Sequence, residues 1–117
     1  MLPVGLCGSN TTTPVVVRVA SLRDHDVAAV VCRSGLIDLA GILYLRTLGS
    51  PLLLIIEEND QRHILNNQRA LSEVECETAL KTITEIGPEY TLSPAFAQAA
   101  SMTSAWMGQH FAQWSPK

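Results

Sequence analysis

Hydrophobic residues in the first part of the chain fall into two runs separated by a short polar break. Residues 15–20 (VVVRVA) are rich in valine, which favours a strand. Residues 27–32 (VAAVVC) form a second run of the same kind, and we expect the two to pair as neighbouring strands. The alternative is a helix over residues 24–33, because Ser21 and Asp24 have the spacing of a capping box.

Two longer hydrophobic stretches follow in the middle of the chain. Residues 36–48 are apolar on nearly all sides and are followed by a glycine and a proline, which predicts a buried helix that ends there. Residues 52–56 (LLLII) are continuously apolar, which is typical of a strand covered on both faces. A tight turn at Asn59 and Asp60 would then lead into a shorter strand over residues 61–67.

The last third of the chain predicts two helices. Ser72 and Glu75 have the spacing of a capping box, and apolar positions then repeat at helical spacing up to a Gly-Pro pair. Ser93 and Pro94 are typical of a helix start, and they open a second helix over residues 95–114.

These elements together predict an α+β fold, in which a mostly antiparallel four-stranded sheet packs against three helices. Residues 1–13 contain glycines, a proline and threonines, and we expect them to form a flexible lead-in. Residues 14–117 would then form a single α+β domain. If residues 24–33 are helical, the prediction changes to a three-layer α/β arrangement with a parallel strand pair.

Composition excludes several classes of protein. The 117 residues are 47% hydrophobic and 16% charged, which is too apolar for a disordered chain. The net charge of −3 argues against a nucleic-acid partner, and no apolar stretch is long enough to span a membrane. Three widely spaced cysteines form no disulfide framework, and the first residues do not resemble a secretory signal. We therefore expect a cytoplasmic protein.

The helix over residues 95–114 carries no formal charge. A helix face open to water normally carries Lys or Glu, and Trp and Met are enriched where proteins meet. This pattern predicts a small adaptor or chaperone-like interaction module rather than an enzyme, which forms a homodimer or binds a protein partner through this helix. The predicted interaction residues are Ala97, Ser101, Ser104, Ala105, Gly108, Ala112, Trp106 and Trp114.

The alternative prediction is a small-ligand-binding, metal-binding or catalytic domain with its site at the acidic turn after the 52–56 strand. Carboxylates at the end of a strand lie at the edge where ligands bind when the sheet is parallel. The candidate residues are Glu57, Glu58, Asp60 and His63. A solvated turn is the simpler interpretation of the same residues.

No motif in the chain predicts a cofactor, a metal or a catalytic residue. The Gly/Ser/Thr-rich segment over residues 5–11 lacks the lysine of a phosphate-binding loop. No two Cys or His residues have the short spacing of a zinc site. Cys76 lies among three glutamates, whose charge disfavours the thiolate and makes this residue a poor nucleophile.

Overall fold

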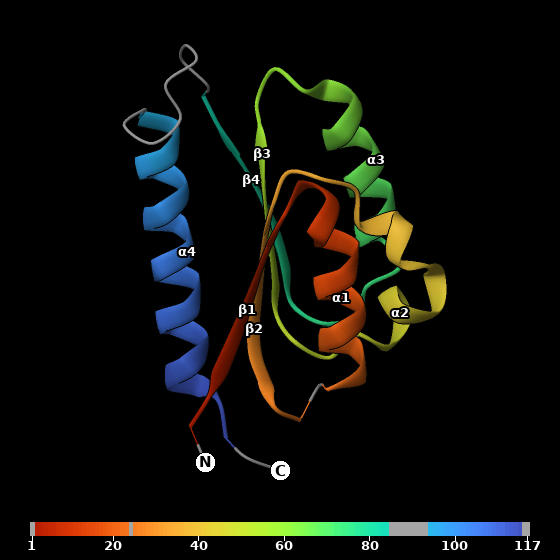
Figure 1. The fold of residues 1–117 in the computed structure, drawn as a ribbon, viewed down its shortest axis with the longest axis vertical. Coiled ribbons are helices and arrows are strands. Elements are labelled where there is room, and N and C mark those ends of the chain that lie inside the picture. Colours follow the sequence, from red (N-terminus) through yellow and green to blue (C-terminus); the bar gives the residue numbers. More distant parts are fainter. Residues whose placement is uncertain (1, 24, 85–93, 116–117) are drawn as a thin grey trace.

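The chain forms a four-stranded sheet in which all strands are parallel (Figure 1). The computed structural model describes residues 2–23, 25–84 and 94–115. The strands are β1 (Val4–Ser9), β2 (Val27–Arg33), β3 (Leu52–Glu57) and β4 (Thr78–Ile83), and they lie side by side in chain order. The predicted mostly antiparallel sheet is wrong, because helical crossovers rather than hairpins join neighbouring strands.

Helices cover both faces of this sheet. The crossovers contain η1 (Asn10–Thr12), α1 (Thr13–Leu22), η2 (Ile37–Ala40), α2 (Ile42–Thr47) and α3 (Gln61–Leu71), and α4 (Pro94–Gln113) follows β4. Figure 1 shows α1, α2 and α3 on one side of the sheet and α4 on the other. The architecture is therefore a three-layer α/β one, as in the alternative prediction, but with β2 as a strand and with four parallel strands.

Alternate residues of the two central strands build two separate cores. Val30, Cys32, Leu52 and Leu54 face the layer of α1, α2 and α3, whereas Ala29, Val31, Leu53 and Ile55 face α4. Successive side chains of a strand point to opposite faces, so a strand between two helix layers must be apolar at every position. This requirement explains the continuous apolar runs of β2 and β3.

The valine-rich residues 15–20 lie in a helix rather than in the predicted strand. Val17 and Ala20 of α1 are fully buried, while Val15 lies on the exposed side. Pro14 stands in the first turn of the helix, where it has no adverse effect because the first helical N–H groups lack intrahelical partners. Tertiary packing of one apolar face thus overrides the local strand preference of valine.

The strand that replaces it, β1, lies within the segment that the sequence predicted to be a flexible lead-in. Two glycines allow this strand to sit close to both helix layers. A Cβ atom at Gly5 would collide with the side chain of Met107 in α4, and one at Gly8 would lie 2.8 Å from Val16 in α1. Glycine in a strand is typical of such close approach.

Three further elements differ from the prediction. The helix expected over residues 36–48 is divided into η2 and α2 at Gly41, whose φ of +101° is not helical. Residues 61–67 belong to helix α3, because Asp60 caps that helix instead of forming a hairpin turn. Asp is favoured at both turns and helix caps, so the sequence alone does not separate the two. The helix expected to follow Ser72 is absent, and strand β4 occupies residues 78–83.

Helix α4 confirms the predicted helix over residues 95–114, although its predicted cap at Ser93 lies outside the described residues. The buried face contains Trp106, which is only 7% exposed and packs on β2 and β3, so this residue is part of the core and not of an interaction surface. Phe96, near the start of the same helix, is 46% exposed. The small residues Ala97, Ser101, Ser104, Ala105, Gly108 and Ala112 are exposed, and Trp114 is half-buried.

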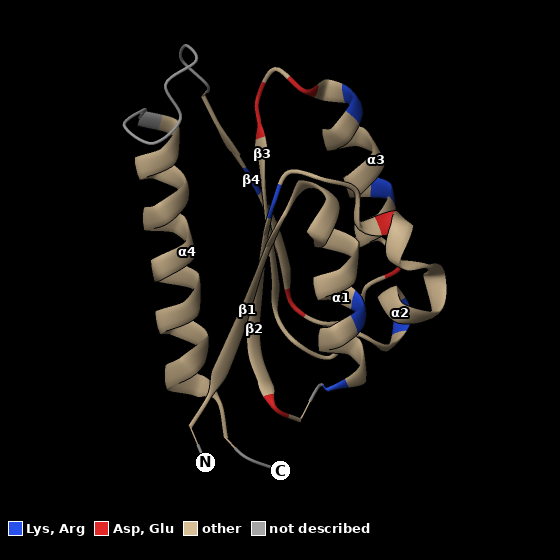
Figure 2. Ribbon diagram, viewed as in Figure 1, with Lys and Arg blue, Asp and Glu red and all other residues tan. Residues whose placement is uncertain are grey.

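The described part of α4 carries no Lys, Arg, Asp or Glu, whereas such residues are spread over the other helices, the strand ends and the loops between them (Figure 2). Of the helices that the structure describes, none has both the length and the hydropathy needed to cross a lipid bilayer.

Candidate functional site

β1 passes directly into a tight turn at the carboxyl edge of the sheet. Ser9 is extended, whereas Asn10 has a φ of +52°, in the left-handed region that costs most residues about 1–2 kcal/mol. The Thr12 hydroxyl closes the turn: it accepts a hydrogen bond from the Ser9 N–H and donates one to the Ser9 carbonyl, both at 2.8 Å. Since α1 begins at Thr13, Asn10 stands at the tip of a strand–turn–helix unit.

The loop after β2 lies beside this turn and is also in an unusual conformation. Ser34 and Gly35 have φ values of +63° and +87°. The buried Thr13 hydroxyl donates a hydrogen bond to the Ser34 carbonyl at 2.8 Å, and the Ser34 N–H donates to the Ile55 carbonyl at 2.9 Å. These bonds tie the loop to α1 on one side and to β3 on the other.

Asn67 of α3 holds the same loop from a third side. Its side-chain amide donates to the Gly35 carbonyl at 2.9 Å, and its Oδ1 accepts from the Ile37 N–H at 3.0 Å. This side chain is 1% exposed, so its two hydrogen bonds satisfy groups that water cannot reach. The loop after β2 is therefore a preorganised wall.

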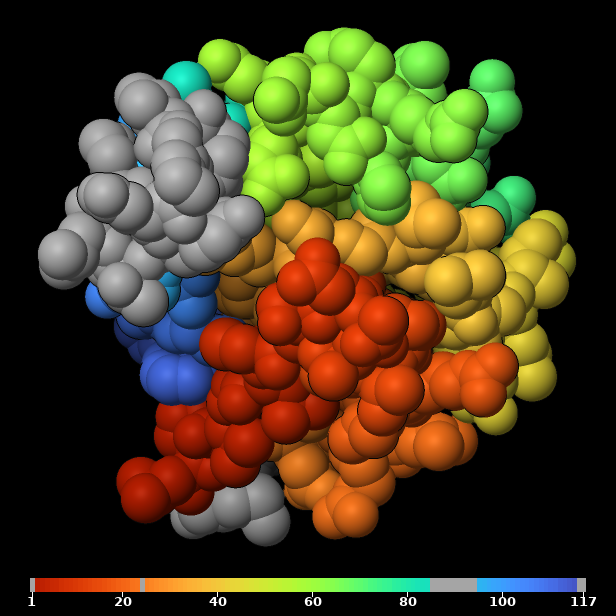
Figure 3. Space-filling model, turned by 45° about the horizontal axis from the view of Figure 1, so that its top comes forward, coloured from red at the N-terminus to blue at the C-terminus, as the bar shows by residue number. Residues whose placement is uncertain are grey.

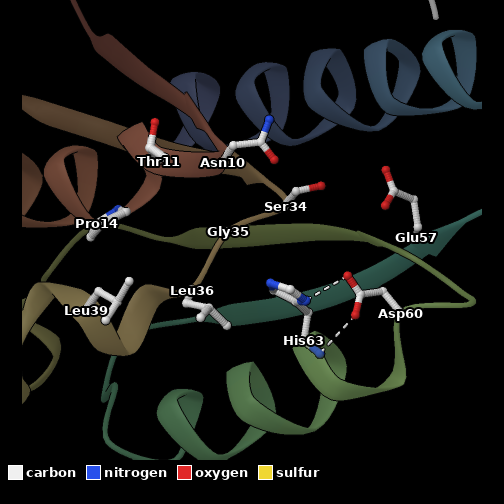
Figure 4. A pocket seen from close by; sticks show the side chains of 10 residues that line it. All are labelled: Asn10, Thr11, Pro14, Ser34, Gly35, Leu36, Leu39, Glu57, Asp60 and His63. Carbon is white, nitrogen blue, oxygen red and sulfur yellow. Dashed lines mark hydrogen bonds and ion pairs between the residues drawn. The ribbon is translucent and has the colours of Figure 1, made fainter.

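Asp60 and His63, at the start of α3, face this wall (Figure 4). Asp60 Oδ1 accepts a hydrogen bond from the His63 backbone N–H at 3.2 Å, and Asp60 Oδ2 lies 2.7 Å from His63 Nδ1. The hydrogen bond with the His63 side chain lowers the pKa of the Asp60 carboxyl below its ordinary value of 3.8. Asp60 is therefore an ionised partner of the imidazole at neutral pH.

These elements enclose an open hollow of about 420 Å³. It is lined by Asn10, Thr11, Pro14, Ser34, Gly35, Leu36, Leu39, Glu57, Asp60 and His63. A second hollow of about 370 Å³ adjoins it and shares Asn10, Ser34 and Glu57 with it. Figure 3 shows the turn after β1, the loop after β2 and the start of α3 meeting at this edge of the molecule. Pro14, Leu36 and Leu39 supply apolar surface, and the remaining side chains are polar.

The structure brings three of the four candidate ligand-site residues together. Glu57, Asp60 and His63 line the hollow, whereas Glu58 does not, although its backbone N–H joins β3 to β4 through the Ile83 carbonyl at 2.9 Å. Within the described residues, no three His, Cys, Asp or Glu side chains are placed to hold a metal ion.

The cysteines do not supply an activated thiol. Burial raises the pKa of Cys32 to about 12 and that of Cys76 to about 11, and it also raises the pKa of Cys7. Because the thiolate is the nucleophile, each shift lowers reactivity. Cys7 is exposed, but it lines a different hollow beside α4 and not the one at His63.

The lowered pKa of Asp60 predicts how acid acts on the fold. A carboxyl whose pKa is lower in the folded chain stabilises the fold above pH 3.8, and this contribution is lost as the pH falls through the folded-state value. We expect the stability advantage of the wild type over Asp60→Asn to be constant at neutral pH and to shrink below about pH 4. Asn also caps helices well, so this variant removes the charge and keeps the cap. Urea unfolding between pH 2.5 and 7 measures the effect, and an advantage that grows in acid would contradict it.

The fold and the site together resemble the α/β-hydrolase arrangement. In that arrangement a sharp strand-to-helix turn exposes a nucleophile at the carboxyl edge of the sheet, and the acid and histidine follow later in the chain. Here Gly8-Ser9-Asn10-Thr11-Thr12 forms such a turn, with Asn10 at the nucleophile position, and Asp60 follows the second strand after it.

Comparison with known proteins supports this class. No protein-family model matches the chain, and no curated protein matches it. Among solved structures, the crystal structure of a dienelactone hydrolase from Anabaena variabilis ATCC 29413 is similar, with a TM-score of 0.82 and 28% sequence identity. The match covers 91% of this chain and 49% of the hydrolase chain, so this chain spans about half of that protein's length.

This similarity overturns the predicted adaptor or chaperone-like module that self-associates through α4, and it favours the alternative of a ligand-binding or catalytic domain. The expectation of a protein partner, of no nucleic-acid partner and of a cytoplasmic location stays a prediction from composition.

Asn10 and Ser34 are the site residues that sequence analysis missed. The segment around Asn10 was tested as a phosphate-binding loop, whereas Gly8 has the place of the first glycine in the nucleophile motif G-x-S-x-G, with Asn10 and Thr12 in place of the serine and the second glycine. The pattern depends on a preceding strand, and the sequence predicted a flexible lead-in at that place. Ser34 has no sequence signal of its own, because the fold alone brings it beside Asn10.

Proposed function

We propose that this chain is a hydrolase-type domain that binds a small ester or lactone at the carboxyl edge of its sheet and forms no acyl-enzyme. The observation that carries this proposal is the left-handed turn at Asn10, which opens on the hollow shared with Asp60 and His63. The similar structure is that of a dienelactone hydrolase, which indicates the class of ligand.

The shape and chemistry of the hollow suit such a ligand. Binding sites for small molecules are concave and combine apolar walls with a few polar groups that orient the ligand. Leu36 and Leu39 supply the apolar wall, and the Asn10 amide and the Ser34 hydroxyl stand at the polar end. Ligand binding needs little rearrangement here, because Thr13 and Asn67 already hold the loop that forms one wall.

Covalent catalysis lacks two of its groups. An asparagine amide at the tip of the turn has no hydroxyl or thiol that could attack a carbonyl carbon. The sequence also contains no histidine between His63 and His110, and His110 is buried against Trp106 on the α4 side of the sheet. Residues of this chain therefore do not by themselves form a Ser…Asp…His relay at the hollow.

Ligand titration by NMR tests the proposal. Small lactones and ethyl esters are added to the labelled protein, and we expect the amide signals of Thr11, Ser34, Gly35 and His63 to shift together. Intact-mass analysis after incubation with an activated ester should show no added acyl group. Shifts confined to other surfaces, or an acyl adduct in residues 9–12, would contradict the proposal.

A matched pair of variants locates the site. Leu39 and Leu43 are similarly exposed, at 62% and 65%, but only Leu39 lines the hollow. Leu39→Asp should weaken binding several-fold by removing apolar contact, and Leu43→Asp should leave it unchanged. Equal effects of the two would place the ligand elsewhere.

A further inference from the structure

We infer that His63, oriented by Asp60, is a general base that activates water for direct attack on an ester or lactone in the hollow. This inference rests on the proposed function and assigns an activity to the same site. This activity needs neither a nucleophilic side chain at position 10 nor the histidine that follows the acid in a Ser…Asp…His relay.

The Asp60 carboxylate contacts the His63 side chain in a way that capping of helix α3 does not require. Asp60 caps α3 through Oδ1, which accepts the His63 backbone N–H at 3.2 Å. The second oxygen, Oδ2, is not needed for the cap, yet it lies 2.7 Å from His63 Nδ1. Both carboxylate oxygens thus contact His63: Oδ1 accepts the hydrogen bond of the backbone N–H, and Oδ2 lies beside Nδ1, which has no other hydrogen-bond partner in the described part of the chain.

The orientation of the His63 ring leaves its other nitrogen, Nε2, available to accept a proton. Figure 4 shows the His63 ring with the edge opposite Nδ1 turned away from Asp60 and towards Leu36. His63 and Leu36 both line the hollow. When the neutral ring carries its proton on the nitrogen that faces the carboxylate, Nε2 carries the free electron pair and can accept a proton. An aspartate in this position also stabilises the imidazolium that forms.

The reaction balances with water as the only co-reactant. The water oxygen attacks the ligand's carbonyl carbon while one water proton passes to His63 Nε2. The tetrahedral intermediate then collapses with cleavage of the carbon–oxygen bond to the leaving group. His63 returns its proton to the leaving alkoxide, so that the products are a carboxylic acid and an alcohol, or a hydroxy acid from a lactone.

Hydrolysis of a p-nitrophenyl ester at fixed pH tests the inference. We expect steady release of nitrophenol above the background of the unfolded protein, with no initial burst and with a slower rate in D₂O. His63→Gln should lower this rate by about tenfold or more, and Asp60→Asn should lower it while keeping the helix cap. His25→Gln, at the opposite edge of the sheet, should leave the rate unchanged and is the matched histidine control.

The inference would be overturned by a rate no higher than background, or by equal rates for the wild type and His63→Gln. A burst in proportion to the protein would also overturn it, because it would show a covalent intermediate. The first two outcomes are separate from failure of the proposed function, since NMR titration with a non-hydrolysable ketone analogue measures binding alone, whereas a burst would contradict both. Binding without His63-dependent hydrolysis removes this inference only, whereas no binding removes both.

Discussion

Gly35→Ala should lower the free energy of unfolding by about 2–5 kcal/mol, because two separate costs coincide at this position. Gly35 has a φ of +87°, which a residue with a side chain adopts only with strain. A Cβ atom there would also collide with the Asn10 carbonyl oxygen and lie 2.9 Å from Thr13 Cβ. The turn after β1 and the loop after β2 would have to separate. We expect the variant to lose ligand binding along with stability, as measured by urea unfolding and titration.

Gly41→Ala is the matched control for this experiment. Gly41 has a φ of +101°, but the nearest atom to an added Cβ is Tyr44 Cδ2 at 3.7 Å, so there is room for the methyl group. Only the backbone cost applies, about 1–3 kcal/mol, because φ of +101° with ψ of +145° lies near a region that residues other than glycine rarely adopt. Equal losses in the free energy of unfolding at the two glycines would show that the close approach of the turn after β1 and the loop after β2 does not contribute to stability.

Trp106→Ala should lower the free energy of unfolding by about 3–5 kcal/mol, since it removes the largest side chain of the core under α4. Trp106 packs on the faces of β2 and β3, and its indole N–H donates to the Pro51 carbonyl at 3.4 Å. Its removal leaves a cavity, whereas the Pro51 carbonyl keeps the hydrogen bond that it accepts from the Val30 N–H at 2.8 Å. Chemical denaturation followed by circular dichroism measures the loss.

Phe96→Ala serves as the comparison on the same helix. About half of the Phe96 side chain is exposed, so its truncation should cost less than about 1 kcal/mol. Trp106 was among the residues that the sequence predicted for an interaction surface, whereas the structure places it in the core. A larger loss for Phe96→Ala than for Trp106→Ala would therefore contradict the packing described above.

Part of the site was accessible from sequence because it follows a single strong element. The run Leu52–Glu57 predicts a buried strand, and polar residues just after such a strand lie at the ligand-binding edge when the sheet is parallel. Glu57, Asp60 and His63 were found in this way. The contribution of Asn10 depends on β1 being a strand, and a segment with two glycines in six residues gives little local indication of that.

The order of residues alone was enough to predict β3 and α4, because each is strongly apolar and bounded by clear breaks, and it favoured β2 as a strand while leaving a helix over residues 24–33 as the alternative. It was not enough for α1, α3 and β4, whose local preferences favoured the other kind of element. The parallel sheet determines what these three segments form. After each strand the chain has to return to the edge of the sheet where the next strand starts, and a helical crossover makes this connection. Packing over the whole chain, and not the preference of any short segment, therefore brought Asn10, Ser34 and His63 to one hollow.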